Sequence, residues 1–281
     1  MSMIHPVREN DALDDFAVSE FTHAGYTYPV FRLGEGPAVL VIHEVPGITP
    51  EVAQFARRVA AAGFTVLMPS LFGVPGRRLT PGYVMQAMAM ACVRREFAVM
   101  AANRTSPVTD FLRGLSRAAH EELGGAVGVI GMCLTGNFAL ALALDPWVRA
   151  PVLSQPSLPL GVTPRLRRAL HLSPQDVARL RQRMDEEQLK VVGLRFTADA
   201  LCGGSRFRAL RERLGPGFEG IEISSKPGNP HGIPPIAHSV VTTDLVDEAG
   251  HPTRQALERV LAFFEEMLRE PPAPQDIGGG L

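Results

Sequence analysis

Cysteine is scarce in this chain, and its charge is almost balanced. Three cysteines among 281 residues are too few for a disulfide framework and suit a reducing compartment, so we expect a cytoplasmic protein. The 28 basic and 29 acidic residues leave a formal net charge of −1. This balance gives no electrostatic reason to expect a nucleic-acid or acidic-membrane partner.

Long hydrophobic runs are also missing. The apolar stretches are interrupted by Arg, Gly or Pro, so none is long enough to span a bilayer. The first ten residues, MSMIHPVREN, lack the apolar core of a secretory signal. The chain contains no repeat and no convincing internal linker. We therefore expect one domain over residues 1–270 and a mobile tail over residues 271–281.

What is present is an alternation of strand-like and helix-like segments. The expected strands are 16–22, 26–32, 38–44, 64–69, 126–131, 149–154, 190–196 and 219–224. The expected helices are 50–62, 84–103, 107–122, 134–145, one that starts at Ser173-Pro174, 206–214 and 253–269. The first two strands read as a hairpin, and the alternation that follows predicts an α/β fold with a mostly parallel sheet and helices on both faces. We expect segments 84–122 and 155–171 to form a roof over a pocket.

The stretch GMCLTG, at residues 131–136, places a cysteine in the turn between an expected strand and an expected helix. A nucleophile elbow needs this arrangement, because a strained strand-to-helix turn lifts one side chain above the sheet. Small residues must flank the turn so that the two backbones can approach closely. The N-terminus of the following helix also favours an anion. Cys133 is therefore the candidate nucleophile.

Two other interpretations of this turn stay open. A dinucleotide-binding loop needs glycine two residues after the first, where this chain has Cys133. A core cysteine at a strand–helix corner needs no special chemistry. Thr135, two residues after the cysteine, is a small departure from an elbow with glycine there.

A catalytic cysteine needs a base, and the base needs an acid that orients it. In chains with such an elbow the acid and then the histidine follow the nucleophile. Asp199 comes just after the expected strand 190–196, although a surface-loop aspartate is the alternative. The segment KPGNPHGIPPIAHSVVT, after the strand 219–224, contains both His231 and His238. The order of nucleophile, acid and histidine is therefore satisfied.

Together these motifs resemble the dienelactone hydrolase family of α/β-hydrolases. The stretch GMCLTG is similar to the family's Gly-x-Cys-Leu-Gly-Gly elbow, and VIHEVPG, at residues 41–47, resembles its first buried strand ending in a glutamate. The stretch from Gly63 to Gly73 resembles its next strand. The similarity extends from about residue 26 to residue 268. It implies an α/β-hydrolase fold and hydrolysis of small esters or lactones, with no metal and no organic cofactor.

The resemblance also implies roles for individual residues. The cysteine attacks an ester or lactone carbonyl, a histidine moves the proton, and Asp199 orients the histidine. Glu44 matches a glutamate that holds the resting thiol and helps to activate it, whereas a satisfied strand-end carboxylate is the alternative. We expect the backbone N–H groups of Leu134 and Val45 to form the oxyanion hole. The stretch HEVPG is not a zinc helix, because the second histidine is absent.

The identity of the catalytic histidine is open. The stretch PGNPHG, at residues 227–232, resembles one form of the family's histidine loop, Pro-Gly-Ala-x-His-Gly. The stretch HSVVT, at residues 238–242, resembles the other form, His-Ser-Phe-Thr. We favour His238 and keep His231 as the alternative.

The substrate-binding residues depart from the family. Dienelactone hydrolases grip a substrate carboxylate with arginines, one of them shortly after the histidine, but neither Thr242 nor Pro235 supplies that charge. The candidates for substrate binding are His43, Arg94, Arg95 and Arg206. Each arginine could equally lie on a solvated helix face, so the natural substrate need not be a dienelactone.

Two functions are compatible with these residues. The first is a cysteine-dependent hydrolase whose only expected partner is a small ester or lactone; the oligomeric state is not readable. The alternative is a non-catalytic ligand-binding or redox-sensing relative, in which Cys133 is oxidised. A serine esterase fails as a third reading, because Ser70, Ser154 and Ser157 do not lie in a Gly-x-Ser-x-Gly turn.

Overall fold

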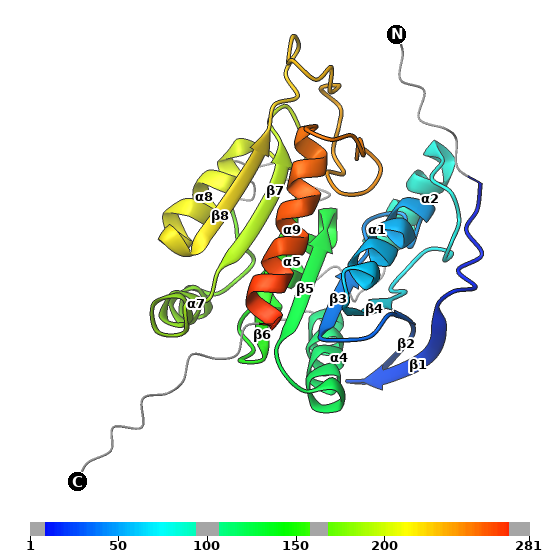
Figure 1. Cartoon of the computed structure of the whole chain (residues 1–281), viewed down its shortest axis with the longest axis vertical. Coiled ribbons are helices and arrows are strands. Elements are labelled where there is room, and N and C mark those ends of the chain that lie inside the picture. Colours follow the sequence, from blue (N-terminus) through cyan, green and yellow to red (C-terminus); the bar gives the residue numbers. More distant parts are fainter. Residues whose placement is uncertain (1–8, 94–106, 158–167, 270–281) are drawn as a thin grey trace.

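A computed structural model describes residues 9–93, 107–157 and 168–269 of the chain. These residues form one eight-stranded sheet with helices on both faces (Figure 1). The strands are β1 (Ala17–His23), β2 (Tyr26–Leu33), β3 (Ala38–Ile42), β4 (Thr65–Pro69), β5 (Val127–Met132), β6 (Val148–Ser154), β7 (Val191–Phe196) and β8 (Phe218–Ile223). All eight expected strands are confirmed, and so is the α/β fold.

The order of the strands across the sheet is β1-β2-β4-β3-β5-β6-β7-β8. The first two strands form the expected hairpin, and β2 pairs antiparallel with β4. From β4 to β8 all neighbouring strands are parallel. The carboxyl ends of β3, β5, β6 and β7 therefore meet at one edge of the sheet, which is where reactive loops gather in folds of this kind.

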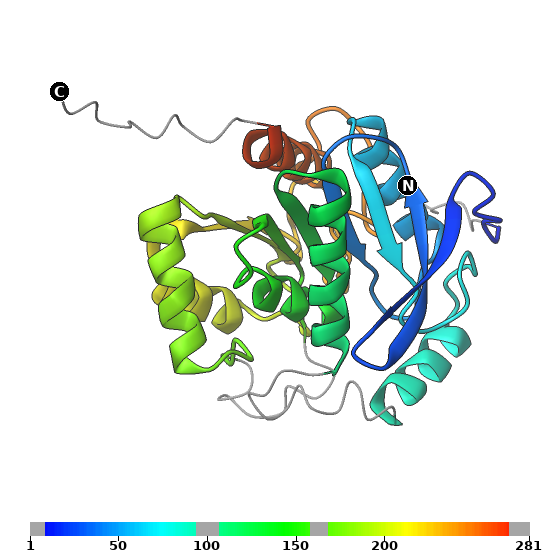
Figure 2. The same ribbon diagram turned by 90° about the horizontal axis from the view of Figure 1, so that it is seen from below.

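Seven α-helices are described in these residues. They are α1 (Pro50–Ala61), α2 (Pro81–Val93), α4 (Pro107–Leu123), α5 (Gly136–Leu142), α7 (Pro174–Glu187), α8 (Gly204–Leu214) and α9 (Pro252–Arg269). Two short 3₁₀ turns accompany them, η2 (Cys133–Thr135) and η3 (Gly215–Gly217). Figure 2 shows α9 on one side of the sheet and α4 and α5 on the other.

Strand β3 illustrates why the sheet is buried on both sides. All five of its residues are fully buried. Leu40 and Ile42 join the core beneath α4, α5, α7 and α8, whereas Val39 and Val41 join the core beneath α1 and α9. A strand covered on both faces needs apolar side chains at every position, and this requirement explains the continuous hydrophobic run in the sequence.

The helix starts follow ordinary capping chemistry. The Thr49 hydroxyl accepts the N–H of Val52 at the start of α1, and Pro50 occupies the first turn. Ser173 caps α7 in the same way by accepting the N–H of Asp176 at 3.1 Å. Proline fits there because the first-turn N–H has no partner inside the helix.

The last part of the predicted roof over 84–122 is α4, and this helix packs against the sheet. Phe111 is fully buried and packs edge-on against Tyr28 of β2 with ring centroids 4.9 Å apart. The helix is amphipathic, so its apolar face covers the sheet. Two stretches of the predicted roof, 94–106 and 158–167, and the predicted tail lie outside the described residues.

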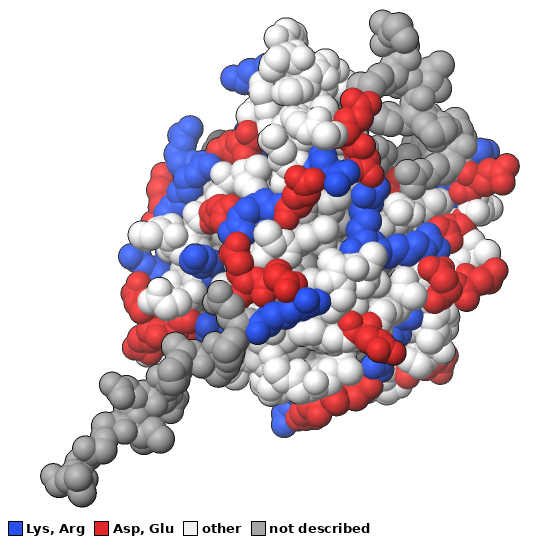
Figure 3. Space-filling model, viewed as in Figure 1, with Lys and Arg blue, Asp and Glu red and all other residues white. Residues whose placement is uncertain are grey.

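The outer surface carries both signs of charge. Basic and acidic side chains alternate over the face made by α1 and α9 (Figure 3). Several of them form ion pairs, such as Arg58 with Asp247 at 2.6 Å and Arg259 with Glu219 at 2.8 Å. Within the described part of the chain, no helix combines the length and apolar character needed to cross a bilayer.

The packing of α4 can be tested by truncating its central aromatic residue. We expect Phe111→Ala to lower the free energy of unfolding by about 3–5 kcal/mol, because a fully buried ring is lost and leaves a cavity. Val18 is 57% exposed, so Val18→Ala should change it by less than about 0.5 kcal/mol. Urea denaturation followed by circular dichroism measures both. Equal, small changes in the unfolding free energy of both variants would show that α4 is peripheral to the core.

Candidate active site

Cys133 lies at the turn between β5 and the η2–α5 helical segment. Its backbone φ is +55°, in the left-handed region that non-glycine residues rarely adopt. Such strain is characteristic of a nucleophile elbow, where it lifts the side chain above the sheet. The Cys133 side chain is half-buried and its thiol is free.

The glycines on either side allow strand and helix to meet. A Cβ on Gly131 would lie 2.3 Å from the Thr135 carbonyl oxygen. A Cβ on Gly136 would lie 3.0 Å from the Cα of Pro156. Any larger residue at 131 would push the helix away from the strand, so glycine there is a steric requirement of the elbow.

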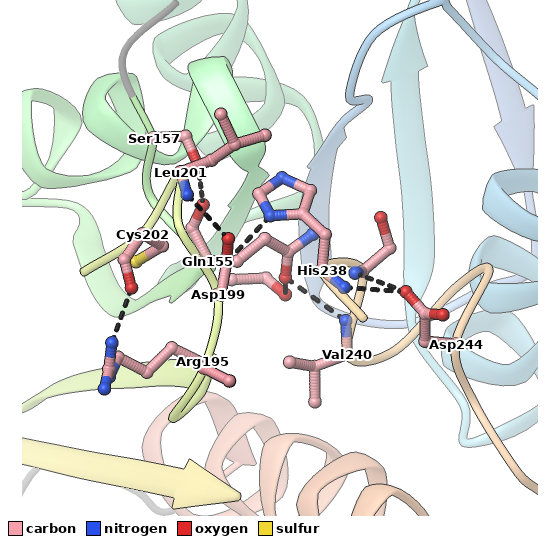
Figure 4. A network of polar contacts seen from close by, with 12 residues as sticks. Gln155, Ser157, Arg195, Asp199, Leu201, Cys202, His238, Val240 and Asp244 are labelled. Atoms are coloured by element: carbon pink, nitrogen blue, oxygen red, sulfur yellow. Dashed lines mark hydrogen bonds and ion pairs between the residues drawn. The ribbon is translucent and has the colours of Figure 1, made fainter. Parts of the chain in front are cut away.

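Asp199 and His238 form a hydrogen-bonded pair beside the elbow (Figure 4). The Nδ1 atom of His238 lies 2.8 Å from Oδ2 of Asp199. The other carboxylate oxygen accepts the N–H of Leu201 at 2.8 Å, so the acid is held from both sides. Asp199 follows β7 and His238 lies in the long segment after β8. The sheet therefore brings together two residues 39 positions apart in the chain.

The charge on the His238 ring is stabilised by its neighbours. Burial opposes this charge, but Asp199 and the Cys133 side chain more than offset it and raise the pKa of His238 to about 11. Nε2 is buried and makes no hydrogen bond of ordinary geometry.

The backbone at His238 is fixed by one carboxylate. Oδ2 of Asp244 accepts the N–H groups of both His238 and Ser239, at 2.8 and 2.9 Å (Figure 4). His231, the alternative base, is exposed and packs edge-on against His251 with ring centroids 5.3 Å apart. Of the two histidines, only His238 bonds to Asp199 within the described contacts.

Glu44 is buried at 3% exposure and accepts three side-chain hydrogen bonds. Its donors are Ser239 at 2.6 Å, Thr242 at 2.5 Å and Gln155 at 3.2 Å. Burial raises the pKa of Glu44 against the opposite effect of the two hydroxyls. In the described contacts Glu44 therefore holds the histidine segment, whereas the sequence resemblance places it on the thiol.

His43 is enclosed in the protein beside Glu44. It is 0% exposed, its Nδ1–H donates to the Glu44 carbonyl and its Nε2 accepts the N–H of Leu71, both at 3.0 Å. Burial lowers the pKa of His43 to about 4, so the ring is neutral. Both ring nitrogens bind backbone, so His43 supports the loop after β3 and leaves no nitrogen for a substrate.

Of the arginines predicted to bind substrate, Arg206 lies within the described residues. Arg206 is 4% exposed and donates to Oδ1 of Asn137 at 2.8 Å. The amide of Asn137 in turn donates to the carbonyls of Leu134 and Ser157. Arg206 thus supports the backbone of the elbow through Asn137, and it lies in the core between α5 and α8. Arg94 and Arg95 lie outside the described residues.

Sequence reasoning missed two positions that organise this site, Gln155 and Asp244. Gln155 is fully buried with φ +36°, bonds to Glu44, and lies 3.4 Å from the N–H of Val240. A polar residue directly after β6 was a usable signal, because the carboxyl ends of parallel strands carry the site. Asp244 carried no comparable signal, since its role depends on how the segment folds back.

The pairing of Asp199 with His238 predicts a measurable titration. We expect Asp199→Asn to lower the pKa of His238, because it removes the carboxylate that stabilises the imidazolium. Nitrogen-15 NMR of the ring would follow it, with the exposed carboxylate variant Asp110→Asn as a control that leaves the titration unchanged. A wild-type ring that titrates near its ordinary value of 6.5 would contradict this assignment.

The same pair sets a pH dependence of stability. A pKa raised from 6.5 to about 11 stabilises the fold fully below the unfolded value and no longer stabilises it above the folded one. The difference in unfolding free energy between wild type and Asp199→Asn should therefore be largest near pH 6 and shrink as the pH rises toward 11.

Comparison with known proteins is consistent with this geometry. The sequence profile of the Dienelactone hydrolase family matches residues 25–172, more than half of the chain. A carboxymethylenebutenolidase of Pseudomonas sp. (strain P51) is 28% identical over 122 residues, which cover 42% of this chain and 49% of that protein. The chain thus spans about half the length of this curated relative.

Solved structures share the fold at low sequence identity. The dienelactone hydrolase-like promiscuous phosphotriesterase P91 from metagenomic libraries has a TM-score of 0.58 and 18% identity, over 90% of this chain and 98% of that chain. A Pyrococcus furiosus esterase has a TM-score of 0.56 and 14% identity, over 90% and 93% of the two chains. The chain has the α/β-hydrolase fold and belongs to the dienelactone hydrolase family.

Proposed function

We propose that this protein hydrolyses small esters or lactones through an acyl-enzyme, with Cys133 as nucleophile, His238 as base and Asp199 as the residue that orients the base. One observation carries the proposal. A cysteine held at φ +55° at the start of a helix has beside it a histidine whose far nitrogen bonds to a buried aspartate. A packing cysteine needs neither the strain nor the pair.

Acylation begins with the thiolate of Cys133. It attacks the carbonyl carbon, a C–S bond forms, and the carbonyl electrons move onto oxygen. When the tetrahedral intermediate collapses, the ester C–O bond breaks and Nε2–H of His238 gives its proton to the leaving alkoxide. In a lactone the new hydroxyl stays attached to the acyl group.

Deacylation reverses the roles. The now neutral His238 takes a proton from water, the hydroxide attacks the thioester, and the C–S bond breaks to release the acid and regenerate the thiolate–imidazolium pair. Asp199 stabilises the imidazolium in both halves of the cycle. We assign the oxyanion to the backbone N–H groups of Leu134 and Val45, which follow β5 and β3.

Within this proposal Glu44 is a positioning residue. Its carboxylate accepts hydrogen bonds from Ser239 and Thr242. These residues follow His238 closely in the chain, so the carboxylate helps to hold His238 beside the elbow. A contact of the Glu44 carboxylate with the resting thiol, which the family resemblance implies, would require breaking these hydrogen bonds. The reaction needs a reduced thiol, which agrees with the low cysteine content and a cytoplasmic location.

The substrate class rests on the family. The Pseudomonas relative is a carboxymethylenebutenolidase by name, and we extend to this chain only the coarser class of small esters and lactones. The hydroxyl of Thr242 is already engaged with Glu44 at 2.5 Å. It therefore does not replace an arginine that would grip a substrate carboxylate.

The nucleophile is tested by exposing the protein briefly to p-nitrophenyl acetate and recording intact mass and nitrophenol release. We expect a transient acetyl adduct on wild type and a loss of turnover of at least about 10³-fold in Cys133→Ala. Cys202 is the matched control, because it is a free thiol that is 1% exposed and its pKa is raised by burial. Cys202→Ala should keep both the adduct and the turnover.

The outcomes separate the two functions. Full activity in Cys133→Ala would contradict the proposed mechanism. An adduct on wild type that never clears would instead favour the redox-sensing alternative, in which the thiol reacts but has no deacylating base.

The choice of histidine is tested by a matched pair of variants. We expect His238→Ala to lower kcat by about 10²–10⁴-fold, because it removes both the base and the partner of Asp199. His231→Ala should change kcat by less than about twofold. The steady-state kinetics of p-nitrophenyl acetate hydrolysis decide between them, and the reverse pattern would transfer the role to His231.

A further inference from the structure

The hydroxyl of Thr135 lies between the two strands that supply the proposed oxyanion hole. Thr135 is 0% exposed. Its Oγ1 accepts the N–H of Met132 at 2.9 Å and lies within 2.9–3.1 Å of the carbonyl oxygens of Met132, Ile42 and His43. A hydroxyl has one proton to donate, so it bonds to one of these carbonyls at a time or shares the proton among them.

This position is the end of the pairing between β3 and β5. The last backbone pair of the two parallel strands is Ile42 with Gly131. Beyond it the chains diverge, one toward Glu44 and Val45 and the other into the elbow. The Thr135 hydroxyl links the two chains just where their ladder stops, so it replaces a missing backbone hydrogen bond with a side-chain bond.

The two expected oxyanion donors lie directly after these anchored points. The N–H of Leu134 follows Cys133 in the elbow, and the N–H of Val45 lies two residues beyond His43. An oxyanion hole works only if both donors are held at hydrogen-bond distance from the same oxygen. The family motif has glycine where this chain has Thr135, so a side-chain link of this kind is a property of this sequence.

We propose that Thr135 is a positioning residue that fixes the distance between the two oxyanion donors through its hydroxyl. The inference rests on the proposed hydrolysis, because it concerns stabilisation of the tetrahedral intermediate. It assigns no contact between Thr135 and the substrate.

The first experiment compares Thr135→Val, which keeps the shape and removes the hydroxyl, with Thr135→Ser, which keeps the hydroxyl. We expect Val to lower kcat for p-nitrophenyl acetate by about 10–100-fold with KM changed by less than about twofold, since one misplaced oxyanion donor costs about 10²–10³-fold at most. Ser should restore kcat to within about threefold of wild type. If Val does not fold, Thr135→Ala, which also removes the hydroxyl, takes its place.

A second readout separates the oxyanion hole from general damage to the elbow. Alkylation of Cys133 by iodoacetamide needs the thiolate but no oxyanion hole, so its rate should be unchanged in the Val variant. Inhibition by 1,1,1-trifluoro-4-phenylbutan-2-one, which forms a tetrahedral adduct with a thiolate, should weaken in parallel with kcat/KM. Thr65→Val is the matched control, because Thr65 is equally buried and its hydroxyl donates to the Gly36 carbonyl at 2.8 Å at the start of β4.

The outcomes are distinct. Wild-type kcat in the Val variant, failure of Ser to restore it, or equal losses of alkylation and hydrolysis would each overturn the proposal. The failure of wild type itself to turn over the ester would reject the proposed function and not this inference alone, and that measurement comes first.

Discussion

The close approach of one strand and one helix at Cys133 is the constraint on which the rest of the structure depends. The turn forces a cysteine to φ +55°, and it exists only because Gly131 carries no side chain against the Thr135 backbone. The strain is maintained by the buried strands on either side, because neighbouring side chains in a close-packed core have no free volume in which the turn could relax. The backbone that carries the Cys133 thiol consequently has little conformational freedom.

A second layer of polar contacts holds the segment that carries His238. Glu44, placed after β3, accepts hydrogen bonds from Ser239 and Thr242, and Gln155, placed after β6, joins the same carboxylate. A buried carboxylate is tolerated because its oxygens are supplied with donors. The histidine segment has no regular secondary structure between β8 and α9, so these contacts and those of Asp244 give it the rigidity that a helix or strand would otherwise provide.

The two histidines near the turn have opposite pKa shifts. The imidazole of His238 keeps a high pKa because of Asp199 and Cys133, whereas the neighbouring His43 is forced to be neutral by burial without an acid partner. The ring of His238 is therefore positively charged near neutral pH, whereas the ring of His43 is neutral. The buried Arg206 donates to Asn137, which in turn donates to the Leu134 carbonyl in the elbow. Arg206 therefore supports the shape of the turn.

The sequence by itself determined the eight strands in their order along the chain and the strand-to-helix turn at Cys133, because hydrophobic runs, glycines and turn residues act locally. It also predicted an aspartate after one strand and a histidine after the next. It left His231 and His238 as alternatives, placed α4 in a roof, and drew no role for Gln155 or Asp244. Only the tertiary structure shows that His238 bonds to Asp199, that α4 packs on the sheet, and what Gln155 and Asp244 contact. Each of these contacts depends on which segments distant in sequence meet at the edge of the sheet. Asp199 lies 39 positions from His238 and Glu44 lies 195 from Ser239, and no local pattern encodes which of two histidines completes such a contact.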